Sequence, residues 1–327
     1  MQSRARDAPA FQADVRQIWD ELQRLEHSGE YGNVEGGSIE QQRDKRLQLH
    51  HCANYAAALS VLRQGHPTDP TDPTNPTDPP NRRLLELGCG SGALTSAFAR
   101  AMPDNWTVEA TDYSESLLAG ARERFEREGL VFSRLDLRSA GPDRLDGFDA
   151  ILLIEVIEHL PPEEADGLLR RAYEGLPAGG MMVLTTLDRS AFPRPFSGYA
   201  PHFVEYTYRS LSGMLNDRRR NPFETYQVHR LLSERIVADS VKAEEHGGYL
   251  VNRLQRLSLG LGRRHAEFGT FHAWVQSRLF CLYSHLPERD GFDLEGYLAT
   301  LDFEQTEPEK RDRDSFGLVA VLRKTAA

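Results

Sequence analysis

Two glutamates and a histidine at helical spacing are the first residues whose types suggest joint chemistry. Glu155, Glu158 and His159 stand at i, i+3 and i+4, directly after the apolar run 150–154. If a helical turn starts at Glu155, all three side chains project from one face. Converging carboxylates and an imidazole can bind Mg²⁺ or Mn²⁺, with His202 as the candidate fourth ligand. Such a cation would lower the pKa of a bound hydroxyl, so Glu155, His159 and His202 are the predicted catalytic residues.

A glycine-rich turn is the second group. Residues 82–92 read R-R-L-L-E-L-G-C-G-S-G, and residues 93–101 have apolar side chains at helical spacing. A strand, a glycine turn and a helix in this order place a nucleotide site at the carboxyl end of the first strand of an open α/β sheet. Glycines are needed here because the backbone turns sharply and a ligand approaches it closely.

Two kinds of nucleotide fit this turn. Gly88-x-Gly90-x-x-Ala93 satisfies the dinucleotide fingerprint, so an NAD(P)-dependent oxidoreductase is one alternative. Glu86, two residues before the first glycine, instead favours a cationic sulfonium cofactor, which an acid can hold directly or through its amino group. A second predicted strand ends in Asp112, roughly 20 residues beyond the turn, where a carboxylate can hold both ribose hydroxyls.

These motifs together resemble the class I S-adenosylmethionine-dependent methyltransferases. The likeness rests on L-E-L-G-C-G-S-G, A-T-D-Y-S, R-L-D-L and F-D-A-I-L-L-I-E-V-I-E-H-L in that order, and it covers about residues 81–188. It implies S-adenosyl-L-methionine as the cofactor. The implied contacts are Glu86, Gly88 and Gly90 with its amino-acid half, Asp112 with the ribose, Asp136 and Leu137 with the adenine, and Cys89, Tyr113 and Ile154 as further cofactor-binding residues.

The acid and histidine motif resembles two methyltransferase families. E-V-I-E-H-L followed by T-T-L-D-R is similar to the ubiquinone-biosynthesis O-methyltransferases, whose motif binds Mg²⁺ and whose acceptor is a catechol. E-V-I-E-H followed by H-F-V-E-Y-T is similar to the small-RNA 3′-terminal 2′-O-methyltransferases, in which two Glu and two His hold a metal on vicinal hydroxyls. Many metal-free methyltransferases also carry the motif, where it orders a loop and Glu155 or His159 is left as a general base.

The predicted function is therefore O-methylation of a small-molecule hydroxyl, a vicinal diol or a catechol, with metal assistance. Methylation of the 2′-hydroxyl of an RNA 3′ end is the alternative. The chain lacks the asparagine-rich segment of the RNA enzymes, and it has a long insert that the quinone enzymes lack.

Composition sets broad limits on class and partners. The chain has 327 residues, 39% of them hydrophobic, and a net charge of −10, which argues against unaided broad binding to nucleic acid. Its three cysteines have no metal or redox spacing, and its first residues lack the apolar core of a signal peptide. We expect a cytoplasmic monomer or homodimer that acts on a small molecule, with RNA as the alternative partner and no membrane association.

The predicted fold is α/β, a doubly wound and mostly parallel seven-stranded sheet of the class I methyltransferase type. The predicted divisions are an N-terminal helical lid at 1–66, a Pro/Thr/Asp linker at 67–80, a Rossmann-like core at 81–188, a helical substrate insert at 189–297 and closing strands at 298–327. The last two strands are expected near residues 301–306 and 316–323 as an antiparallel pair. In the alternative arrangement, residues 223–231 form the sixth strand and the insert follows them.

Overall fold

A computed structural model of the chain describes residues 8–27, 45–65, 81–199, 201–245, 253, 292–304 and 312–325. The predicted linker at 67–80 lies outside these ranges, as do residues 246–252 and 254–291 of the predicted helical insert. Among the described residues, no helix is both long enough and apolar enough to cross a bilayer.

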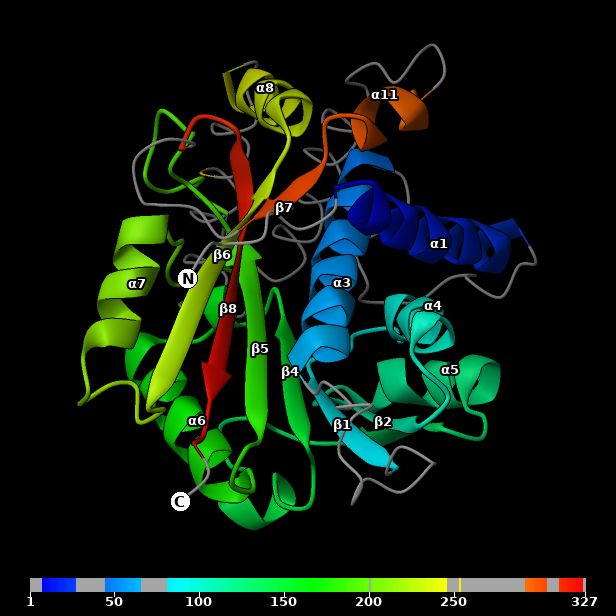
Figure 1. Cartoon of the computed structure of the whole chain (residues 1–327), viewed down its shortest axis with the longest axis vertical. Coiled ribbons are helices and arrows are strands. Elements are labelled where there is room, and N and C mark those ends of the chain that lie inside the picture. Colours follow the sequence, from blue (N-terminus) through cyan, green and yellow to red (C-terminus); the bar gives the residue numbers. More distant parts are fainter. Residues whose placement is uncertain are drawn as a thin grey trace, which may run out of the picture.

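One mixed sheet runs through the molecule (Figure 1). Its strands are β1 (Arg82–Leu87), β2 (Trp106–Asp112), β3 (Leu130–Arg134), β4 (Ala150–Ile154), β5 (Met181–Leu187), β6 (Thr225–Leu232), β7 (Asp302–Glu304) and β8 (Ser315–Arg323). Their order is β3-β2-β1-β4-β5-β8-β6-β7. The first five strands pair in parallel, and β8 is antiparallel to both β5 and β6. The chain adds β2 and β3 on one side of β1 and then β4 and β5 on the other side. The carboxyl ends of β1 and β4 therefore lie side by side at the point where the strand order reverses, which is where open α/β sheets bind ligands.

The sheet confirms the expected α/β class, but it has eight strands in the described residues where seven were expected. The expected antiparallel pairing of the last two strands is wrong, because β7 and β8 both pair with β6, which lies between them. Strand β6 lies where the alternative arrangement placed the sixth strand, at residues 223–231. The segment predicted as a helical insert therefore contributes a strand to the sheet before any insert begins.

Helices cover both faces of the sheet (Figure 1). They are α1 (Ala8–His27), α3 (Lys45–Gly65), α4 (Ala93–Ala101), α5 (Glu115–Phe125), α6 (Pro162–Gly175), α7 (Tyr208–Asn216), α8 (Glu234–Ala243) and α11 (Leu294–Leu298), with short 3₁₀ turns η1 (Pro142–Arg144) and η2 (Ile157–His159). One apolar core lies beneath α1, α3, α4 and α5, and a second lies beneath α6 and α7. Packing of apolar side chains in these two cores holds the helices against the two faces of the sheet, and the sheet in turn positions the site.

Helix α3 lies deep in the first core. Its residues from Cys52 to Leu59 are all buried, and α1 packs along it. These buried residues include Ala53, Ala56 and Ala57, and the helix contacts β4 and β5. The predicted N-terminal lid is thus represented by two helices: α3 contacts β4, β5, β6 and β8, and α1 contacts α4 and β7.

Candidate functional site

The turn after β1 requires its three glycines for different reasons. Gly88, Gly90 and Gly92 have φ of 84°, 57° and 76°, a region that L side chains rarely adopt. A Cβ on Gly88 would lie 2.6 Å from Cγ2 of Val156, and a Cβ on Gly92 would lie 2.6 Å from Cε1 of Phe132. A Cβ on Gly90 would meet no atom of the described residues within 4 Å. Gly90 therefore presents its backbone to open space, where a ligand can approach it.

Asp112 ends β2 beside this turn. Its Oδ2 accepts a hydrogen bond from the Gly90 amide at 3.0 Å, and its Oδ1 accepts one from the Ser114 amide at 2.9 Å. These two bonds fix the plane of the carboxylate, and each oxygen has a further lone pair. The geometry suits a carboxylate that accepts hydrogen bonds from two neighbouring hydroxyls.

A cavity of about 140 Å³ lies against the turn. Its walls come from α1, α3, the glycine turn and the end of β4, and are formed by Leu22, Gln48, His51, Tyr55, Gly88, Cys89, Gly90, Ser91, Leu94, Ile154 and Glu155. Four predicted cofactor-binding residues, Gly88, Cys89, Gly90 and Ile154, are among them. The helices of the predicted lid supply four more lining residues.

The predicted adenine contacts lie outside this cavity. Asp136 lines a separate, open hollow of about 610 Å³, and its carboxylate lies 3.0 Å from the Arg138 guanidinium. The hydrogen bond from Arg138 lowers the pKa of Asp136. The Leu137 carbonyl accepts a hydrogen bond from Arg171 at 2.6 Å, and Tyr113 is 68% exposed. The lining of the first cavity includes none of these three residues, nor Glu86 or Asp112, so their contact with the cofactor stays a prediction.

Among the described residues, Glu86 is a buried acid without a cationic partner. It is 1% exposed, its Oε1 accepts a hydrogen bond from the Tyr55 hydroxyl on α3, and its buried Oε2 has no hydrogen-bond partner in the described part of the chain. Burial raises the pKa of Glu86 to about 7, an effect that the bond from Tyr55 partly opposes. A cationic ligand beside Oε2 would stabilise the ionised form.

The Glu86 carboxyl should make the ligand-free protein less stable as the pH rises. The folded state holds a proton on Glu86 up to about pH 7, whereas the unfolded chain loses it near 4.5, so stability falls between these values. The difference corresponds to about 3 kcal/mol. Thermal unfolding should show that Glu86→Gln and wild type have similar melting temperatures at pH 5. At pH 8 the melting temperature of Glu86→Gln should be higher than that of wild type. A variant that melted below wild type at pH 8 would contradict this account.

Glu155 does not start a helical turn. Its φ is +52°, the one positive φ among the described non-glycine residues, and the 3₁₀ turn η2 begins two residues later. The expectation that Glu155, Glu158 and His159 share one helical face is therefore wrong. Glu155 faces α3, where its Oε2 lies 3.4 Å from Nε2 of His50, and its buried Oε1 has no hydrogen-bond partner among the residues described. Backbone strain of this kind costs about 1–3 kcal/mol and is common at functional sites.

The structure does bring Glu158, His159 and His202 together, with one ligand atom from each within 4.8 Å of the others. The His159 and His202 rings meet edge to face at 4.7 Å between centroids. Backbone pairing holds the loop in place, because the Phe203 amide donates to the Glu158 carbonyl at 2.8 Å. His202, the predicted fourth ligand, is in this group, whereas Glu155, also predicted as a metal ligand, is outside it among the described residues.

Burial sets the charge states in this cluster. Burial, and then the nearby Glu155, raise the pKa of Glu158 and so favour its protonated form, while the Thr186 hydroxyl donates to its Oε2 at 2.9 Å. A bound cation would favour the ionised carboxylate instead. Burial and the neighbouring His202 lower the pKa of His159 to about 4, so its ring is neutral and able to ligate. One carboxylate and two imidazoles fit Mn²⁺ better than Mg²⁺, which prefers oxygen ligands throughout.

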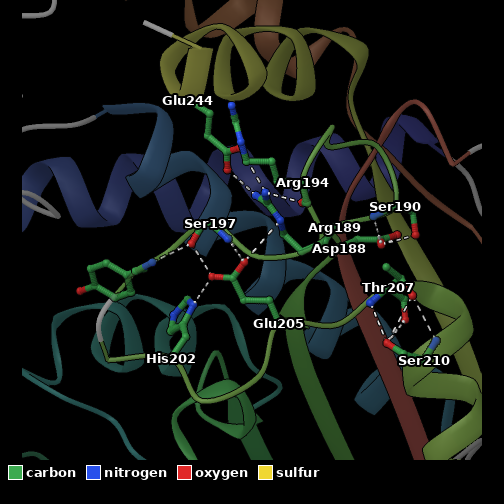
Figure 2. Close-up of polar contacts among 11 residues, drawn as sticks. Asp188, Arg189, Ser190, Arg194, Ser197, His202, Glu205, Thr207, Ser210 and Glu244 are labelled. Atoms are coloured by element: carbon green, nitrogen blue, oxygen red, sulfur yellow. Dashed lines mark hydrogen bonds and ion pairs between the residues drawn. The ribbon is translucent and has the colours of Figure 1, made fainter. Parts of the chain in front are cut away.

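A buried ion network positions His202 (Figure 2). Glu205 Oε1 lies 2.8 Å from Nδ1 of His202, and Glu205 Oε2 accepts a hydrogen bond from the Ser197 amide at 2.7 Å. Arg189 lies between two acids, with Nε 3.3 Å from Glu205 and Nη1 2.5 Å from Glu244. Burial opposes ionisation of Glu205, but the bonds from His202 and Ser197 and the charge of Arg189 outweigh it and lower its pKa. An ionised Glu205 can accept a hydrogen bond from Nδ1–H of His202, and in that tautomer the unprotonated Nε2 is the ligand atom.

One segment of the chain matches a known family. Residues 85–182 match the family model described as a methyltransferase domain. That match confirms the predicted methyltransferase family for this segment, which contains the glycine turn, Asp112 and the Glu155–His159 motif.

The methyltransferase domain also has curated relatives. A ubiquinone biosynthesis O-methyltransferase from Caulobacter sp. (strain K31) is 34% identical over 115 residues, which are 33% of this chain and 42% of the relative. A carboxy-S-adenosyl-L-methionine synthase from Chromohalobacter salexigens is 35% identical over 103 residues, 31% of this chain and 38% of the relative. The chain thus spans about two-fifths of the length of either relative. A solved coclaurine N-methyltransferase is 18% identical with a TM-score of 0.47, covering 94% of this chain and 87% of that one.

Five residues of the site were not among the predicted site residues. His50, His51 and Tyr55 reach the methyltransferase domain from α3, and Glu205 and Arg189 orient His202. The His202-x-x-Glu205 spacing was a usable signal, because an acid three residues from a candidate ligand can orient its ring. The contacts from α3 had no such signal, since they depend on how the lid packs.

Proposed function

We propose that the chain is an S-adenosyl-L-methionine-dependent methyltransferase that methylates a hydroxyl group of a small molecule. The observation that carries the proposal is the glycine turn with an acid on either side, Glu86 at the end of β1 and Asp112 at the end of β2. Gly90 between them offers exposed backbone and a fixed hydrogen-bonding partner in Asp112. The family match and the O-methyltransferase relative support this choice.

The residues of the site fit the cofactor. The orphaned buried Oε2 of Glu86 suits an ammonium group, and the oriented Asp112 carboxylate suits a ribose diol. When bound, the cofactor supplies an electrophilic methyl group. The protein's part is to hold the nucleoside at the turn and to exclude water beneath α3, so that the acceptor meets the methyl carbon in line.

The acceptor hydroxyl is expected beside the carboxyl end of β4. Glu155 lines the cavity there and contacts His50, so this pair can accept the proton that the hydroxyl loses. Glu158, His159 and His202 would hold a divalent cation, Mn²⁺ in preference to Mg²⁺. A cation bound there would stabilise the acceptor as an oxyanion, which makes a catechol or another vicinal diol the proposed acceptor.

Ligand binding tests the cofactor assignment without knowledge of the acceptor. Calorimetry should detect binding of S-adenosylhomocysteine but not of NADH. In thermal unfolding, S-adenosylhomocysteine should raise the melting temperature and NADH should not. Binding of NADH without S-adenosylhomocysteine would replace the proposal by the oxidoreductase alternative. Mass spectrometry of the purified protein for a retained nucleoside and cation is the complementary measurement.

A second candidate function is 2′-O-methylation of an RNA 3′ end. The observation that favours it is the approach of a second histidine, His202, to Glu158 and His159, since the RNA enzymes that the motif resembles use two histidines. Titration of a short RNA at several salt concentrations decides between the two. Affinity that falls steeply with salt supports the RNA candidate, and no binding at low salt removes it.

Glu205→Gln is expected to weaken Mn²⁺ binding by about 10–100-fold, the usual cost of losing an outer partner of a metal-ligating histidine. The reason is that a neutral amide no longer fixes the Nδ1–H form of His202. Free Mn²⁺ measured by electron paramagnetic resonance reports the affinity directly. Glu244→Gln is the matched control, because Glu244 contacts Arg189 at the far side of the network from His202. Equal Mn²⁺ affinity in wild type and Glu205→Gln would refute the role of Glu205.

A further inference from the structure

We propose that Arg171 of α6 is a positioning residue for recognition of the nucleoside base. Its guanidinium holds the turn after β3 so that the Leu137 amide can donate a hydrogen bond to the base. The proposal rests on the proposed function, because the nucleoside would be that of the cofactor. It gives a part in ligand recognition to α6, which packs in the second core, on the face of the sheet opposite to α3.

The turn after β3 fixes the direction of the Leu137 amide. The Asp136 carbonyl accepts hydrogen bonds from the Ser139 and Ala140 amides, at 3.1 and 3.0 Å. The peptide bond between Asp136 and Leu137 is trans, so its N–H points away from its carbonyl and out of the turn. Among the described residues the Leu137 amide has no hydrogen-bond partner. It is therefore a donor directed to the outside of the turn.

The next peptide plane is held on both sides. Its N–H, that of Arg138, donates to Oδ1 of Asp136 at 3.0 Å. Its carbonyl, that of Leu137, accepts from Nη2 of Arg171 at 2.6 Å. The first bond forms within the turn, whereas the second comes from α6 and ties the turn to the rest of the protein. Because Leu137 lies between the two peptide planes, fixing the second plane also limits rotation of its amide.

Helix α6 supports this turn in place of a longer helix between β3 and β4. All of residues 135–149 are described, and η1 is their only helical segment. Helix α6 packs directly on η1, where a Cβ on Gly175 would lie 2.8 Å from the Pro142 carbonyl oxygen. One helical turn before Gly175, the half-buried Arg171 reaches the Leu137 carbonyl. Within the described part of the chain, this is the only hydrogen bond of the Arg171 side chain, so a substitution there removes a single defined contact.

The turn lies where the base of a nucleoside at Asp112 can reach it. Strands β2 and β3 pair in parallel, and the Leu135 amide donates to the Asp112 carbonyl at 3.0 Å. Neighbouring strands are about 4.8 Å apart, so a base attached to a ribose at Asp112 would extend over the end of β3. Tyr113, which is 68% exposed, offers a ring against which such a base can stack.

The groups at this turn select adenine by its edge. The Leu137 N–H is a donor, and the neighbouring Asp136 carboxylate is an acceptor. Adenine presents the complementary pair, an acceptor at N1 beside a donor at its amino group. Hypoxanthine carries a hydrogen on N1 and an oxygen in place of the amino group, so it mismatches both.

Two ligands give a readout that a purely structural role of Arg171 would not change. S-adenosylhomocysteine carries adenine, and S-inosylhomocysteine carries hypoxanthine. Calorimetry with the full chain should show that Arg171→Met weakens binding of S-adenosylhomocysteine by about three- to tenfold, the scale of one neutral hydrogen bond. Binding of S-inosylhomocysteine should change by less than about twofold, so the preference for adenine falls. Arg171→Lys keeps a donor and should retain more of that preference.

A neighbouring arginine provides the matched control. Arg170 is exposed on the same helix, and its side chain donates to the Asp166 carbonyl of that helix at 3.4 Å. Arg170→Met should therefore leave both affinities unchanged. The two affinities are compared within one variant, so a general loss of stability cannot produce the expected change in preference. Equal losses for both ligands in Arg171→Met, or an unchanged affinity for S-adenosylhomocysteine, would overturn the positioning role. If wild type bound neither ligand, the proposed function itself would fail.

Discussion

Asp112→Ala is expected to raise the dissociation constant of S-adenosylhomocysteine by at least about tenfold. Hydrogen bonds to a charged group are each worth about 1.5–3 kcal/mol, and the substitution removes the carboxylate that would accept both ribose hydroxyls. It also removes the bond from the Gly90 amide, so the turn loses a partner at the same position. Calorimetry with purified wild type and variant gives the comparison directly.

Asp112→Asn separates these two contributions. An asparagine keeps one acceptor oxygen that can still hold the Gly90 amide, but it lacks the charge and the second acceptor. We expect its affinity to be reduced nearly as much as that of the alanine variant, with a smaller loss of melting temperature in the absence of ligand. Wild-type affinity in the alanine variant would show that the nucleoside does not bind at this turn.

Glu158→Gln should lower Mn²⁺ affinity by roughly a hundredfold or more, since losing even an outer-shell partner costs about 10–100-fold. The substituted side chain would keep an amide oxygen that accepts from the Thr186 hydroxyl, so the local structure is retained. The measurement is again free Mn²⁺ by electron paramagnetic resonance. S-adenosylhomocysteine affinity should remain within about twofold of wild type, because the Glu158 side chain lies with Thr186, His159 and His202 and not with the glycine turn.

Chelation provides the matched experiment on the wild-type chain. Treatment with a chelator followed by dialysis should lower the melting temperature if a cation had been retained, and added Mn²⁺ should restore it. The same treatment should leave Glu158→Gln unchanged. Tight Mn²⁺ binding by Glu158→Gln would mean that the cation site lies elsewhere, and the general base at Glu155 would then be the remaining assistance to the acceptor.

The first part of the sheet was predictable because its signals are local. Leu84, Leu85 and Leu87 before three glycines indicate a buried strand and a sharp turn, and the structure has the strand and three glycines with positive φ. Asp112 ends the next strand as its spacing predicted. Residues close in sequence determine the strand and the turn, so both can be predicted from short sequence patterns.

The other end of the sheet was predicted less well for a physical reason. Strand β6 carries His229 and Arg230 in the buried core, where charged and polar side chains are uncommon. Arg230 is tolerated there because it pairs with Asp312 and lies over the Tyr208 ring. Those partners are distant in sequence, so the segment was predicted only as an alternative strand. Glu155 shows the same limit, because its positive φ depends on packing around the end of β4.

The hydrogen bond from Tyr55 to Glu86 ties α3 to the first strand of the core, directly over the glycine turn. We expect a nucleoside that binds at the turn to break this bond and shift the helix, and the same shift to recur when the spent nucleoside leaves. Product release would then require a motion of α3, and such motions occur on the microsecond to millisecond scale. We expect the rate of product release, rather than the rate of methyl transfer, to limit turnover. Pre-steady-state kinetics would register it as a burst of the first turnover.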